Sequence, residues 1–127
     1  MRYVVDSNKP VEQLVNDLSA AVVRHGFGVI HQHDLEATMA NKGVTLGAPC
    51  RVLDVCNPHK AKEVLSADMG MAVVLPCRIA VYHDARGSHI GMVKPTALLA
   101  MFSDAPELFG VAEEVEQKLI QMIDEAR

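Results

Sequence analysis

The sequence predicts an α+β two-layer sandwich, in which a mixed or antiparallel sheet carries helices on one face. Three observations predict this fold class. Short apolar segments typical of strands alternate with segments of helical periodicity, and a hairpin signal follows them in the last third of the chain. Half of the residues are hydrophobic and 22% are charged, as in ordinary globular chains. The 127 residues fit a single domain, residues 1–127, that can bury a core without disulfides.

The first part of the chain alternates strands with helices. Residues 2–6 predict a strand, and residues 10–25 predict a helix that ends at Gly26. Residues 27–33 predict a second strand, and residues 35–41 a short helix. The apolar face of the first helix consists of Val11, Leu14, Val15, Leu18, Ala21 and Val22.

A third strand is predicted over residues 51–56, and a helix begins directly after it. Asn57 is a good N-cap and Pro58 suits the first helical position. The helix is expected to end near residue 68. Its predicted buried face consists of Ala61, Val64 and Leu65.

A hairpin is predicted next. Residues 71–82 give a long strand signal, in which Pro76 should cause a bulge, an edge position or a break, because proline has no N–H for a ladder. A turn at residues 85–87 leads into a strand over residues 88–94, so these two strands should pair antiparallel.

Two helices are predicted to close the chain. Residues 95–101 suit a short helix, and Asp104 with Glu107 resembles a capping box at the start of a long one. The long helix should run to about Ala126. Its apolar face consists of Leu108, Val111, Val115, Leu119, Met122 and Ala126.

Charge and aromatic content argue against a nucleic-acid partner. The net charge is −4 and the pI is near 5.8, with lysines and arginines scattered along the chain. There is no Trp, and two Tyr and three Phe are too few for a base-stacking platform. No phosphate-binding loop, nucleophile elbow or dinucleotide fingerprint occurs either.

We expect a soluble, cytoplasmic protein with no membrane partner. Residues 1–6 lack the apolar run of a signal peptide, and the longest apolar stretch, residues 71–77, is too short to span a bilayer. Three cysteines, an odd number in such a chain, indicate free thiols or a ligand role and not a disulfide framework.

Cys56 is the best candidate for a reactive residue. It stands just before the predicted N-cap, where the helix dipole and free N–H groups favour the thiolate, which is both a nucleophile and a metal ligand. His59 lies just inside the same helix and could share the site. The alternative interpretation is that Cys56 ends a strand, packs as a small apolar residue and never ionises.

The other two cysteines are placed differently. By strand alternation Cys77 shares a face with Val73, Leu75, Ile79 and Val81. That face is apolar, which favours a buried core position. Cys50 precedes Cys56 by six residues, roughly 20 Å along a straight strand, so these two cannot share a site.

Two pairs of histidines also stand out. His31 and His33 point to one face of a strand and could bind a metal with Asp34 or a cysteine nearby, although no His-x-x-x-His or Cys-x-x-Cys motif accompanies them. His83 and His89 flank the predicted hairpin and are expected to form a polar, solvent-facing pair.

The order of these motifs resembles the family called domain of unknown function 302, over nearly the whole chain. The motifs are Gly26-Phe27-Gly28-Val29, Asp34, Lys42-Gly43, Cys56-Asn57-Pro58 and Leu75-Pro76-Cys77. The resemblance implies a fold similar to the TATA-binding-protein-like fold. It does not imply DNA binding, because a fold alone does not determine function. It implies no established reaction. Cys50 and Asp54 depart from the aromatic and the small residue expected at their positions.

Three functions are compatible with these features. The first is a small binding protein for a metal or a small ligand, at the Cys56-Asn57-Pro58 turn near Cys77. The second is a sulfur-transfer or redox enzyme with Cys56 as its catalytic nucleophile. The third is a structural or interaction protein that acts as a homodimer, because an uncovered sheet face has to be hidden. The expected ligand-binding residues are Cys56, Asn57, His59 and Cys77, of which Cys56, Cys77 and His59 would hold a transition metal.

Overall fold

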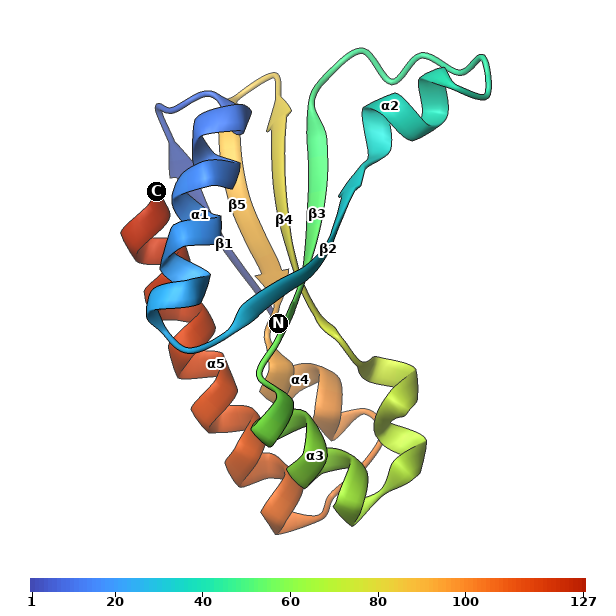
Figure 1. The fold of residues 1–127 in the computed structure, drawn as a ribbon, viewed down its shortest axis with the longest axis vertical. Helices are drawn as coiled ribbons and strands as arrows, with labels where there is room; N and C mark the ends of the chain where they lie inside the picture. The colour runs from blue at the N-terminus through green and yellow to red at the C-terminus, as the bar shows by residue number, and fades with distance from the viewer.

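The protein forms a five-stranded antiparallel sheet with two long helices packed on one face, as Figure 1 shows. The computed structural model describes residues 1–127. The strand order is β1-β5-β4-β3-β2, and every neighbouring pair is antiparallel. The α+β two-layer sandwich predicted from the sequence is thus confirmed. The strands are β1 (Arg2–Ser7), β2 (Gly28–Asp34), β3 (Cys50–Cys56), β4 (Cys77–Asp84) and β5 (Gly87–Val93).

The helices occupy three places around the sheet. In Figure 1, α1 and α5 lie side by side against the sheet, α3 and α4 gather at one end, and α2 stands at the other end. The short 3-10 helix η1 joins the group at the α3 end. The helices are α1 (Val11–Arg24), α2 (Leu35–Ala40), α3 (Pro58–Ala67), η1 (Met69–Val74), α4 (Pro95–Ala100) and α5 (Pro106–Ala126).

The main core lies between the sheet and the pair α1 and α5. All six residues predicted for the apolar face of α1 are buried. They meet the inward-facing side chains of the sheet, among which Leu53, Ile79 and Ile90 are completely buried. The spacing of apolar residues in α1 therefore predicted this layer correctly, because one stripe of a helix must pack on one face of a sheet.

A second, smaller core lies at the end of the sheet where α3 is found. It joins α3, η1 and α4 to the first turns of α5 through five buried residues: Val64, Met71, Leu99, Leu108 and Ala112. Of the predicted buried face of α3, Val64 is buried, whereas Ala61 and Leu65 are only half-buried. The chain thus has two separate apolar clusters, one under the sheet and one at its end.

The strand predicted over residues 71–82 is wrong in its first half. Residues 69–74 form η1, which begins where the Asp68 carboxylate accepts a hydrogen bond from the Gly70 N–H at 2.8 Å. Met71 is buried in the second core. The peptide between Leu75 and Pro76 is cis. Because β4 begins only at Cys77, Pro76 breaks the predicted strand, which is one of the three outcomes expected for it. The first half of this apolar run thus forms a helical turn that buries Met71, and not a strand.

The two predicted helix caps have different outcomes. Asn57 does cap α3, because its Oδ1 accepts hydrogen bonds from the N–H groups of His59 (3.0 Å) and Lys60 (3.3 Å). Asp104 does not cap α5. That helix has Ala105 at its N-cap and Pro106 at its first position, where proline has no N–H that needs a partner.

Candidate functional site

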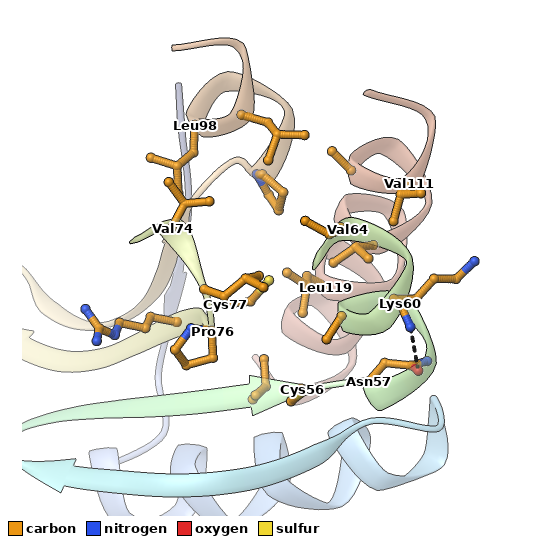
Figure 2. A pocket seen from close by; sticks show the side chains of 18 of the residues that line it. Cys56, Asn57, Lys60, Val64, Val74, Pro76, Cys77, Leu98, Val111 and Leu119 are labelled. Carbon is orange, nitrogen blue, oxygen red and sulfur yellow. Dashed lines mark hydrogen bonds between the residues drawn. The ribbon is translucent and has the colours of Figure 1, made fainter. Parts of the chain in front are cut away.

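A cavity of about 430 Å³ opens between the two cores, as Figure 2 shows. Its walls come from the end of β3, the start of β4, and the helices α3, η1, α4 and α5. Hydrophobic residues make up 17 of the 22 that line it. Protein cavities that hold small organic ligands have volumes of roughly 300–1,000 Å³, so this one is of sufficient size.

Two of the three cysteines line this cavity. Register pairs Cys77 with Val55, so Cys77 lies on the side of the sheet that faces the helices and packs against the main core. Cys56 ends β3 one residue later and lines the same cavity. In Figure 2 both lie on the strand side, with Val64 and Leu119 on helices across from them. The structure therefore brings Cys56, Asn57 and Cys77 to one site.

The thiol of Cys77 is neutral at ordinary pH. Burial raises its pKa to about 11, and the nearby Cys56 adds a smaller increase. A thiol that stays protonated is a poor nucleophile and a poor metal ligand. Cys77 therefore acts as part of an apolar wall: it is half-buried and packs against the main core, on the face of the sheet that strand alternation predicts.

The N-terminus of α3 offers no free N–H group to a Cys56 thiolate. The N–H groups of residues 59–61 already bond to Asn57, whose side chain takes two of them and whose carbonyl takes the third. Pro58 has none to give. The N–H groups expected to be free at the start of α3 are therefore taken up by its own cap.

The predicted transition-metal ligands are not assembled. His59 is exposed and does not line the cavity. No three side chains of His, Cys, Asp or Glu gather to hold a metal ion anywhere in the structure, which includes the trio of Cys56, Cys77 and His59. His31 and His33 do stack edge to face, with ring centroids 4.3 Å apart, but without a third ligand.

The charged groups along the cavity already have partners. Lys60 Nζ binds the carboxylate of Glu114 and lies 3.6 Å from that of Glu63. Arg78 Nε lies 3.1 Å from Asp54 Oδ1. The cavity therefore offers a ligand mainly apolar contacts.

The mouth of the cavity is apolar as well. Val73 and Phe102 both line it, and they are 75% and 52% exposed. An apolar cavity with exposed apolar side chains at its opening is typical of sites that bind small ligands. Neither residue was singled out from the sequence, because both belong to segments that reach the cavity only through the second core.

Asp54 forms a polar cluster on the sheet side opposite the helices. Asp54 is only 6% exposed, and this burial raises its pKa. Hydrogen bonds from His33 (2.9 Å) and Arg78 (3.1 Å) lower the pKa by more than burial raises it, so the net pKa is below the usual value. The carboxylate therefore stays ionised. Its signal in the sequence is an acidic residue between two apolar ones, Leu53 and Val55.

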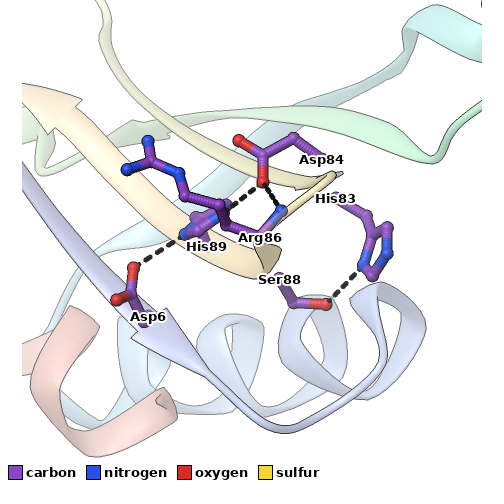
Figure 3. A network of polar contacts seen from close by, with 6 residues as sticks. All are labelled: Asp6, His83, Asp84, Arg86, Ser88 and His89. Carbon is purple, nitrogen blue, oxygen red and sulfur yellow. Dashed lines mark hydrogen bonds and ion pairs between the residues drawn. The ribbon is translucent and has the colours of Figure 1, made fainter.

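A second polar network ties β1 to the β4–β5 hairpin (Figure 3). His89 lies between Asp84 (2.7 Å) and Asp6 (2.8 Å), and hydrogen bonds to these two carboxylates raise its pKa. His83 contacts Ser88 instead, at 3.2 Å. The expected solvent-facing pair of His83 and His89 is wrong, because register pairs His83 with Ser88 and leaves His89 only 4% exposed.

The fold and the cavity define a class: an antiparallel α+β sandwich with an apolar cavity between two cores. The chain belongs to the family Domain of unknown function DUF302, whose model matches residues 3–126. It is similar to the crystal structure of an uncharacterized conserved protein DUF302 from Bacillus stearothermophilus, with 32% identity and a TM-score of 0.93. That similarity covers 99% of this chain and 98% of the other. No curated protein matches the chain.

The resemblance inferred from the cysteine and proline motifs is thereby confirmed. Neither the family nor the solved relative carries an assigned function. No helix in the structure combines the length and the apolar character needed to cross a bilayer.

Proposed function

We propose that this protein binds a small, largely apolar and uncharged organic ligand in the cavity between its two cores. The observation that carries the proposal is the cavity itself, with about 430 Å³ of space and 17 hydrophobic residues among the 22 that line it. A ligand in this place would contact both cores at once. Burial of its apolar surface would supply the binding free energy.

The polar groups support an uncharged ligand. Lys60 and Arg78 are both held by carboxylates, so a charged ligand would have to compete with existing ion pairs. The neutral thiol of Cys77 is compatible with an apolar partner. The proposal is limited to an organic ligand, because no three metal-binding side chains are gathered.

The thiol-enzyme alternative stays a prediction. Cys56 lines the cavity, but the N–H groups of α3 that would stabilise its thiolate are bonded to Asn57. No observation favours it over ligand binding.

A fluorescence titration tests the binding proposal. N-phenyl-1-naphthylamine, a neutral apolar probe, should bind the wild-type chain saturably at one site. Ala61→Phe places a ring on the cavity wall of α3 and should weaken binding about tenfold or more. Ala67→Phe, on the exposed end of the same helix, is the matched control and should bind as the wild type does. Absent saturable binding, or equal affinity in Ala61→Phe, contradicts the proposal.

We also propose that the protein is a cytoplasmic homodimer. All three cysteines are free, which supports a reducing compartment. One face of the sheet is covered by neither α1 nor α5, which supports self-association. Light scattering at micromolar concentration tests the dimer, and a monomeric mass there would contradict it.

A further inference from the structure

The sheet face opposite α1 and α5 has an apolar middle. Register aligns one residue from each strand in a row across it: Val4, Gly91, Ala80, Val52 and His33. We call this row the central row, and the side of the sheet on which it lies the outer face. Four of its five members are apolar or lack a side chain. The Val4 side chain packs directly on Gly91, because a Cβ added to the glycine would lie 2.9 Å from Val4 Cγ2. Val4 therefore covers the backbone of β5 at this point.

Charged side chains flank the central row with opposite signs at its two sides. Arg2 and Arg78 lie where β1 and β4 begin, and Asp6 and Asp84 lie where the same strands end. By strand alternation all four are on the outer face, since β1 and β4 run in the same direction. The side chains of Arg78 and Asp6 are 65% and 84% exposed.

Internal pairing cancels only part of this charge. Asp54 offsets one of the two arginines, and His89 lies between the two aspartates, where its hydrogen bonds to them raise its pKa. The end of the outer face with Arg2 and Arg78 therefore stays positive, and the end with Asp6 and Asp84 stays negative. This distribution is complementary to itself when it is turned end over end.

The buried polar groups of the outer face already have hydrogen-bond partners within the chain, so a second protein surface could cover them without breaking hydrogen bonds. Asp54 is bonded to His33 and Arg78, and His89 is bonded to two carboxylates. No buried side-chain nitrogen or oxygen in the chain lacks a partner. A surface of this kind can enter an interface without leaving unpaired polar atoms behind.

The geometry points to the outer face as the interface of the homodimer, with the two sheets stacked face to face about a twofold axis that runs along the central row. This inference rests on the homodimer proposed above and specifies its surface and its register. Such an axis keeps each strand over its own copy but reverses its direction. Arg2 of each copy then lies over the Asp6 end of the other, and Arg78 over the Asp84 end.

The outer face has the area that a specific dimer needs. Five strands of six to eight residues, at about 4.8 Å between strands and about 3.3 Å per residue, give a face of roughly 500 Å². Two such faces bury roughly 1,000 Å² in total, which is near the lower limit for a specific interface. We therefore expect a dimer that dissociates on dilution.

Sedimentation velocity of the full chain over a range of micromolar concentrations tests the interface. Ala80→Arg puts a long charged side chain in the middle of the central row and should raise the dimer dissociation constant about tenfold or more. Gln121→Arg adds the same charge on an exposed site of α5 and should leave the dimer unchanged. Arg2→Glu places like charges together and should also weaken the dimer, less so in high salt.

The outcomes separate the two proposals. A wild-type chain that stays monomeric overturns the homodimer and this interface with it. A dimer that persists in both Ala80→Arg and Arg2→Glu overturns the interface alone. Binding of N-phenyl-1-naphthylamine by Ala80→Arg shows that the variant is folded, because the cavity does not include residue 80.

Discussion

At the scale of the residue, Cys77 makes the clearest chemical prediction. Its thiol has a pKa of about 11, mainly because it is buried. In a chain whose only cysteine is Cys77, made by Cys50→Ser and Cys56→Ser, alkylation by iodoacetamide should accelerate about tenfold per pH unit up to about pH 10, because the thiolate fraction does so. Mass spectrometry of timed samples measures the rate.

The control for this prediction is the chain that keeps only Cys56. Both variants carry two serines, so they differ only in which thiol remains. A Cys77 rate that levels off below about pH 9 would show a thiol that ionises much like a free one, whose reference pKa is about 8.5.

Single residues differ in how far the sequence predicts them. The side of the sheet on which Cys77 lies follows from strand alternation, because β4 begins directly after Pro76 and alternates regularly from there. The burial of His89 does not follow, because its partner Asp6 comes from β1, far away in the chain, and its partner Asp84 from the other side of the hairpin turn. Register decides such contacts, and a sequence pattern contains no register between distant strands.

At the scale of the element, the 21-residue helix α5 contains a removable weakness. Gly110 lies within it, and a Cβ added there would meet no atom within 4 Å. Gly110→Ala should raise the free energy of unfolding by about 0.5–1 kcal/mol, because alanine favours a helix over glycine by that amount. Urea unfolding followed by circular dichroism measures it.

A second glycine serves as the opposite control. Gly87, the first residue of β5 after the hairpin turn, has a φ of +119°, which a residue with a side chain rarely adopts. Gly87→Ala should destabilise the chain. If Gly110→Ala gave no gain in stability, the space beside position 110 would not be open to a side chain in the folded protein.

Elements with strong periodicity were predicted well, and an apolar run without it was not. The face of α1 follows from its spacing, and the cap of α3 from Asn57 and Pro58. Residues 71–74 were assigned to a strand because a short apolar run suits a strand and a buried helical turn equally. They pack with α3 and, in the second core, with α4 and α5, which come later in the chain, so the second core and the cavity beside it were not predictable from local pattern.

At the scale of the whole molecule, the two cores differ in size. The main core contains 19 buried residues and the second contains 5. Amide hydrogens in α3 and α4 should therefore exchange faster than those in β3 to β5, because fewer buried contacts hold these helices in place. Saturation with N-phenyl-1-naphthylamine should slow the exchange in α3 and α4. Hydrogen-exchange mass spectrometry measures both effects.

The cavity-filled variant provides the control for this experiment. In Ala61→Phe the probe should leave exchange in α3 unchanged, since its site is blocked. Equal protection of α3 and β4 in the free wild-type chain would show that the two cores open as one unit.

The edge strand β2 bears on how copies of this chain can assemble. Its pairing with β3 shifts register between Val29 and His31, and Ile30 at the shift is 60% exposed. An edge that carries such a bulge presents its free N–H and C=O groups at irregular spacing, so an extended strand from another molecule cannot zip onto it. Fibril growth requires that kind of edge-to-edge addition. In the dimer proposed above, stacking through the outer face stops at two copies, so that assembly stays a closed pair while the bulged edge of β2 disfavours open-ended polymerisation.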